Sequence, residues 1–135
     1  QRNRKSMTDS YRILIVDDDL DILANLSDIL SELGYDIITA ASGQEALERL
    51  GDSDSDEVQR LDLCLLDFKM PGMDGVELLE KIHERRPEVP AIMVTAYAGE
   101  DGDRRAMEAG TWKVMRKPVD VRLLIGMIGQ AIVSK

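Results

Sequence analysis

Short apolar runs alternate with amphipathic stretches five times along the chain. The runs occupy residues 12–16, 35–39, 61–66, 90–94 and 112–115. Three of the runs are rich in Ile, Val or Leu and show little alternation between apolar and polar positions. This pattern is typical of strands buried on both faces of a parallel sheet.

The stretches between the runs carry apolar residues at helical spacing, and their flanking residues indicate where helices begin and end. A first helix is expected over 20–33, where Gly34 supplies a C-terminal stop. A second is expected between Ser42 and Gly51, because Ser42 and Glu45 form a capping-box pattern.

Three further helices follow the third, fourth and fifth runs. The third begins with the pair Asp74 and Glu77 and stops at Pro87. The fourth is expected around 102–109, after a flexible acidic start over 99–103. The fifth is marked by apolar positions at helical spacing, namely Val121, Leu124, Ile128 and Ala131.

Five strand-helix units in strict alternation predict an α/β fold, a doubly wound five-stranded parallel sheet in an α/β/α sandwich. The 135 residues suffice for one domain, expected over 10–135 after a flexible N-terminal tail over 1–9. In such sheets ligands bind at the carboxyl ends of the strands.

The composition of the chain disfavours some classes of binding partner and indicates a cellular compartment. The formal charge of -9 disfavours direct binding to nucleic acid or to an anionic membrane surface. No apolar run is long enough to span a bilayer. Cys64 is the only cysteine and lies within an apolar run, which predicts a buried thiol in a reducing compartment, the cytoplasm.

One acidic segment, 51–60, interrupts the alternation of strands and helices. We interpret it as a solvated loop. Binding of a cation by its acids is disfavoured, because the spacing lacks the glycine and the terminal glutamate of a calcium loop.

Carboxylates, a hydroxyl and an amine follow the predicted strands. The first strand runs into Asp17 and Asp18, the third into Asp67, the fourth into Thr95 and the fifth into Lys117. Crowded carboxylates repel one another unless a cation joins them, and hard oxygen ligands suit Mg²⁺. Such a cluster favours attack by an aspartate on a phosphoryl group, beside a lysine charge.

A blander interpretation is that the aspartates only cap the helices that follow. Asp18 or Asp19 could serve in that way as well. Capping explains neither Lys117 nor the position of Asp67 before a loop.

Four blocks of residues carry a resemblance to a known family. The blocks are ILIVDDD at 13–19, LLDFKMPGMDG at 65–75, VTA at 94–96 and KP at 117–118. In this order they resemble the signature blocks of bacterial response regulator receiver domains, and the resemblance extends from about residue 12 to residue 132. It implies a flavodoxin-like fold with strand order 2-1-3-4-5.

The resemblance also implies a role for each site residue. Asp67 matches the phosphoacceptor. Asp17 and Asp18 match the acidic pair that holds Mg²⁺, with Asp18 the more direct ligand. Lys69 matches the position whose backbone carbonyl binds the metal.

Two more matches concern the phosphoryl group. Thr95 matches the switch hydroxyl, and Lys117 matches the lysine that contacts the phosphoryl oxygens. In the family the peptide bond between Lys117 and Pro118 is usually cis.

The resemblance further implies partners and an output. The phosphoryl group comes from a sensor histidine kinase or a histidine phosphotransfer protein. Phosphorylation then shifts the face formed by the fourth helix, the fifth strand and the fifth helix, through which a homodimer could form. The protein would be a switch and no enzyme beyond self-phosphorylation and slow autodephosphorylation.

The sequence departs from the family pattern at one position. Val114 stands where receiver domains usually carry Tyr or Phe, so the rotating aromatic switch is missing. Trp112 is interpreted as a packing residue on the other face of the strand, with a switch role as the alternative. Tyr97 either gates the site or is an exposed loop aromatic, and Lys69 could hinder or recruit attacking water.

Other functions fit the sequence less well than that of a receiver domain. His83, the only histidine, lies near the end of a predicted helix and is interpreted as a surface residue. A haloacid-dehalogenase type phosphatase needs a second aspartate where Lys69 stands and also needs a cap. A receiver-like interaction module that is never phosphorylated would not need all five signature residues. Nucleotide-binding glycine motifs are absent.

Overall fold

Five parallel strands form one sheet in the order β2-β1-β3-β4-β5 in this computed structural model. The structure describes residues 10–51, 60–96 and 99–134. The strands are β1 (Arg12–Val16), β2 (Asp36–Ala40), β3 (Leu63–Asp67), β4 (Ala91–Thr95) and β5 (Lys113–Arg116). The helices are α1 (Leu20–Glu32), α2 (Gly43–Leu50), α3 (Gly75–Arg85), α4 (Glu100–Glu108) and α5 (Val121–Ser134).

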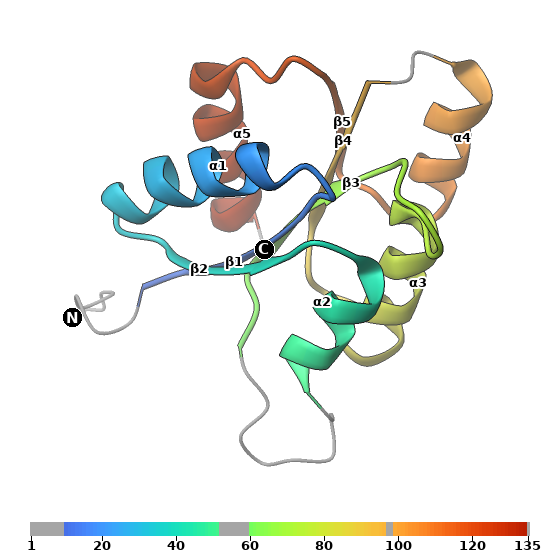
Figure 1. Ribbon diagram of the computed structural model, residues 1–135, viewed down its shortest axis with the longest axis horizontal. Helices are drawn as coiled ribbons and strands as arrows, with labels where there is room; N and C mark the ends of the chain where they lie inside the picture. The colour runs from blue at the N-terminus through green and yellow to red at the C-terminus, as the bar shows by residue number, and fades with distance from the viewer. Residues whose placement is uncertain (1–9, 52–59, 97–98, 135) are drawn as a thin grey trace.

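The helices cover both faces of the sheet. Helices α1 and α5 lie on one face, and α2, α3 and α4 lie on the other (Figure 1). The predicted fold class and the strand order implied by the resemblance are therefore both confirmed.

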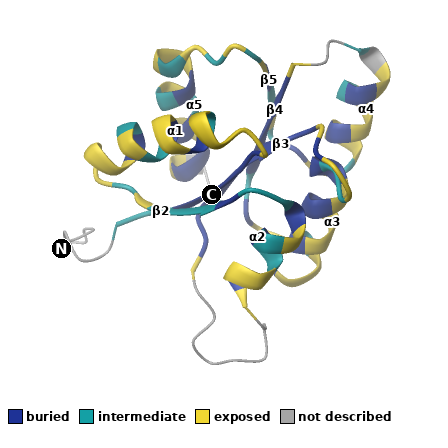
Figure 2. Ribbon diagram, viewed as in Figure 1, coloured by how far each residue is buried: buried dark blue, intermediate teal, exposed yellow. Residues whose placement is uncertain are grey.

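The central strands are buried on both faces, as their continuous apolar runs predicted. Every residue of β3 and β4 is buried (Figure 2). Because side chains alternate across a strand, Leu65 packs towards α1 and α5, whereas its neighbour Leu66 packs towards α2 and α3. The sheet thus separates two hydrophobic cores.

Helix ends follow the predicted stop and start residues. Gly34 has a φ of 100° just after α1, a conformation that favours glycine. Asp74 and Glu77 form a complete capping box at the start of α3. At α2 the box is incomplete, because the Glu45 side chain accepts from the Ala41 N–H at 2.7 Å.

Several strand boundaries differ from the prediction by one or two residues. The clearest case is β3, which begins at Leu63 instead of residue 61. The Asp62 side chain accepts from the Arg12 N–H at 2.8 Å, and Asp62 N–H donates to the Arg12 carbonyl at 2.9 Å. A carboxylate therefore takes the place of a main-chain partner at this edge of the strand pair.

The fourth helix begins two residues earlier than the predicted range of 102–109. Helix α4 already begins at Glu100, after Gly99. Acidic residues in a first turn interact favourably with the helix dipole, and Asp103 pairs with Arg116 of β5 at 2.7 Å. The helix therefore runs through Gly102, and Asp103 connects it to β5.

Two predictions concern residues beyond the described ranges. The tail over 1–9 lies outside them, as does most of the acidic segment over 51–60. None of the helices in the described ranges combines the length and the hydropathy that crossing a bilayer requires.

Candidate phosphorylation and metal site

The strand register brings the predicted site residues to one edge of the sheet. Val16 pairs with Leu66, so Asp17 and Asp67 follow at the same level. Asp67 in turn pairs with Val94, directly before Thr95. Lys117 comes after β5, and its N–H donates to the Thr95 carbonyl at 2.8 Å.

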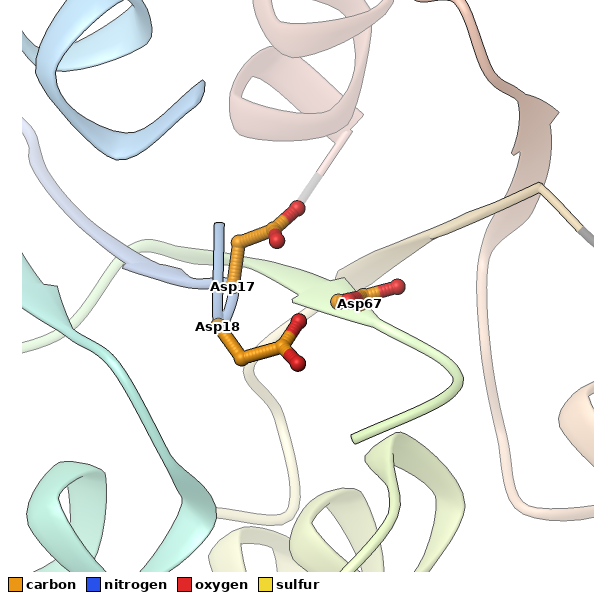
Figure 3. A group of neighbouring side chains, drawn as sticks. All are labelled: Asp17, Asp18 and Asp67. Atoms are coloured by element: carbon orange, nitrogen blue, oxygen red, sulfur yellow. The ribbon is translucent and has the colours of Figure 1, made fainter. Parts of the chain in front are cut away.

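Three carboxylates converge at this edge. Asp17 and Asp18 come from the end of β1, and Asp67 comes from the end of β3 (Figure 3). One oxygen atom of each lies within 4.8 Å of the other two. The metal-binding trio expected from the sequence is therefore brought together.

The three aspartates that follow β1 differ in their burial and in their hydrogen bonds. Asp17 is buried, and its Oδ1 accepts from the Asp19 N–H at 2.9 Å. The Asp19 side chain caps α1 by accepting hydrogen bonds from the backbone N–H groups of Asp21 and Ile22. This is one of the two capping roles that the sequence predicted. Asp18 is exposed, which leaves its carboxylate turned towards the site (Figure 3).

Lys117 lies between the two buried carboxylates. Its Nζ is 3.0 Å from Asp17 Oδ2 and 3.5 Å from Asp67 Oδ1. The peptide bond between Lys117 and Pro118 is cis, as expected. The two distances place the amine where it can contact a group attached to Asp67.

The charges shift the pKa values of both partners. Burial, and then the charge of Asp17, raise the pKa of Asp67 to about 7, although Lys117 opposes the shift. Burial disfavours the charged amine of Lys117, but the hydrogen bond and charge of Asp17, together with Asp67, raise its pKa overall. Asp67 is therefore a buried carboxyl group beside another carboxylate, and the charge of Lys117 offsets these two effects only in part.

This arrangement fits a divalent cation. A hard cation between the three carboxylates would offset the charges of Asp17 and Asp18, which add to the effect of burial on the pKa of Asp67. The donors are all oxygen atoms, as Mg²⁺ prefers. Asp17, Asp18 and Asp67 could hold the ion.

An open cleft of about 600 Å³ leads to the site. It is lined by Asp18, Asp19, Asp67, Lys69, Ala96 and Lys117. Asp67 is buried, but it lines this cleft, which gives its side chain a route to solvent. The Lys69 carbonyl remains a predicted ligand, and Thr95 is fully buried at the end of β4.

The cleft also includes residues to which the sequence analysis gave no binding role. Ala96 follows Thr95 and lines the opening. Its position directly after a strand tip was the signal in the sequence that could have identified it.

Residues 112 and 114 lie in different cores. Trp112 packs against the core on the side of α1 and α5, and Val114 packs against the core on the side of α2 and α3. This confirms Trp112 as a packing residue on the other face. Tyr97 lies outside the described residues.

Two other sequence interpretations have clear outcomes. Cys64 is fully buried, and burial raises the pKa of its thiol to about 12, as expected for an unreactive core residue. His83 is only half-exposed, and its Nε2 lies 2.8 Å from the Val89 carbonyl. It therefore joins α3 to the following loop, so the expectation of a simple surface residue was incomplete.

The raised pKa of Asp67 predicts how metal-free stability depends on pH. Between the ordinary value of 3.8 and about 7, the folded carboxyl keeps a proton that the unfolded chain releases. The folded state binds more protons in this window, so its stability falls as pH rises. Asp67→Asn removes this effect and should be more stable than the wild type by on the order of 1–3 kcal/mol above about pH 7.

Urea unfolding in a chelator at about pH 5 and about pH 8 measures this difference. The advantage of Asp67→Asn should grow with pH, and added Mg²⁺ should remove it by stabilising the wild type. An advantage that is equal at both pH values would contradict the assigned electrostatics.

Comparisons with known proteins match the family and the fold. A family model of the response regulator receiver domain matches residues 13–129. The response regulator protein PilR of Pseudomonas aeruginosa is 34% identical over 121 residues, which are 90% of this chain and 26% of PilR. Sporulation initiation phosphotransferase F of Bacillus subtilis is 36% identical over 110 residues, covering 82% of this chain and 84% of that protein.

A solved structure of a receiver domain is also similar to this chain. A CheY-like response regulator receiver domain protein from Methanospirillum hungatei is similar with a TM-score of 0.84 and 38% identity. The similarity covers 93% of this chain and 95% of that one. The chain spans about a quarter of PilR and of the transcriptional regulator NtrC of Klebsiella pneumoniae, at 26% and 24%.

Proposed function

Because this chain belongs to the response regulator receiver domain family of two-component signalling, we propose that Asp67 is its phosphoacceptor. The observation that carries this assignment is the position of Asp67 at the floor of the cleft, 3.5 Å from Lys117 and beside two further carboxylates. An acceptor needs an accessible oxygen and nearby positive charge, and this residue has both.

The residues around Asp67 have two roles in phosphoryl transfer, namely to bind the metal and to contact the phosphoryl oxygens. Asp17, Asp18 and Asp67, with the Lys69 carbonyl, would hold Mg²⁺, which supplies positive charge against the phosphoryl oxygens. Lys117 contacts one phosphoryl oxygen, and the Thr95 hydroxyl donates to another.

The reaction exchanges one bond to phosphorus for another. An Asp67 carboxylate oxygen attacks in line, while the bond from phosphorus to the donor nitrogen of phosphohistidine breaks and the imidazole leaves. Water later cleaves the acyl phosphate, which releases inorganic phosphate and returns the carboxylate. We propose no turnover beyond this self-phosphorylation and slow autodephosphorylation.

The partners follow from this chemistry. The donor would be a sensor histidine kinase or a histidine phosphotransfer protein, acting in the cytoplasm. The output surface would be the face of α4, β5 and α5, which could also form a homodimer. The net charge of -9 argues against direct contact of this domain with nucleic acid.

Intact-protein mass spectrometry after incubation with acetyl phosphate and Mg²⁺ tests the assignment. We expect one labile phosphoryl adduct on the wild type and none on Asp67→Asn. Asp19→Asn is the matched control, because Asp19 lines the same cleft but caps α1. An adduct on Asp67→Asn would overturn the proposal, and steady turnover of phosphate esters would favour a phosphatase.

A further inference from the structure

The loop after Asp67 is anchored to the sheet at one end. Phe68 follows Asp67 directly, its N–H donates to the Val94 carbonyl at 3.0 Å, and its ring is buried. The Phe68 carbonyl accepts from the Gly75 N–H at 2.9 Å. The segment from 68 to 75 is therefore closed by its own hydrogen bond.

The other end of this loop presses on Asp67 itself. A Cβ atom on Gly75 would collide with the Asp67 carbonyl oxygen and would lie 2.8 Å from Met93 Sδ. The start of α3 thus lies against the main chain of Asp67 with no free space. The start of α3 and Phe68 are therefore both in position to transmit a displacement to Asp67.

One side chain of α4 reaches both ends of the loop. The guanidinium carbon of Arg105 lies 5.6 Å from the centre of the Phe68 ring, within the range of a cation–π contact. Its Nη2 is 3.3 Å from Oδ2 of Asp74, whose other oxygen caps α3 through Glu77 N–H at 2.8 Å. A planar guanidinium can stack on a ring and pair with a carboxylate at once, which an ammonium cannot do as well.

We propose that Arg105 is a positioning residue that couples α4 to the phosphoacceptor by holding Phe68 and Asp74 at the two ends of the Asp67 loop. This inference rests on the proposed role of Asp67. Arg105 is absent from the residues that line the cleft, so it would act through Phe68 and Asp74.

The neighbouring arginine provides a matched control. Arg104 lies in the same turn of α4 but pairs with Asp101 of its own helix at 2.9 Å. We expect Arg105→Ala to slow phosphorylation by acetyl phosphate roughly two- to five-fold and to speed amide exchange of the Gly75 N–H, while Arg104→Ala changes neither. Arg105→Lys keeps a charge for Asp74 and should restore part of the exchange protection.

A double variant tests whether the effect of Arg105 depends on its ion pair with Asp74. Asp74→Asn retains a capping oxygen but removes the charge, so the effect of Arg105→Ala should be smaller in this background. Equal rates and equal exchange in Arg105→Ala and Arg104→Ala would overturn the inference, as would an undiminished effect in Asp74→Asn. A wild type without an adduct would instead overturn the proposed role of Asp67.

Discussion

Lys117→Met is expected to slow phosphorylation of the protein by acetyl phosphate by about 100-fold or more. The Nζ atom of Lys117 is the positive group that lies 3.5 Å from Asp67 Oδ1, and it is already in place before a phosphoryl group arrives. Removing it also raises the pKa of Asp67 further, because Lys117 is the group that lowers it. The rate is measured by following the adduct with intact-protein mass spectrometry.

Lys113→Met is the matched control for this loss. Lys113 is an exposed lysine of β5 that lies over the Trp112 ring, on the same strand but away from the cleft. Its replacement should leave the rate unchanged. Raising the pH should recover only the part of the Lys117→Met defect that comes from protonation of Asp67. A Lys117→Met protein as fast as the control would contradict the proposed contact.

Asp18→Ala is expected to weaken Mg²⁺ binding by at least ~10-fold, because even outer-shell ligand changes cost that much in many metal sites. Asp18 is the exposed member of the trio, and its carboxylate faces Asp67. Its loss therefore removes a ligand without opening the core. Isothermal titration with MgCl₂ measures the affinity directly, and beryllofluoride should tighten binding only in the wild type.

Asp21→Ala controls for the loss of one negative charge near the site. Asp21 is exposed in the first turn of α1, and its side chain is absent from the cleft lining. We expect its Mg²⁺ affinity to stay within about two-fold of the wild type. Equal weakening by Asp18→Ala and Asp21→Ala would show that general charge, and not ligation, sets the affinity.

Much of the fold could be predicted because local and global signals agree. Apolar runs without alternation gave β3 and β4, and Gly34, Asp74 and Glu77 marked helix ends that the structure retains. The errors arose where a tertiary contact decides a boundary. Asp62 replaces a main-chain partner of Arg12, a pairing across 50 residues that no local pattern contains.

The site was predictable for a topological reason. Parallel strands bring their carboxyl ends to one edge, so residues after different strands converge without any information on distance. The sequence could not tell that Asp17 is the aspartate bound to Lys117 at 3.0 Å while Asp18 stays exposed. It also could not predict that Arg105 contacts Phe68, since that contact depends on how α4 packs on α3.

Borohydride trapping of the phosphorylated protein tests the central claim most directly. Hydride reduction converts an aspartyl phosphate to homoserine, so peptide sequencing by mass spectrometry identifies the residue that carried the phosphoryl group. We predict homoserine at position 67, formed only when Mg²⁺ and a phosphodonor are both present. Homoserine at another aspartate, or a phosphoryl group on a side chain that borohydride leaves intact, would contradict the account.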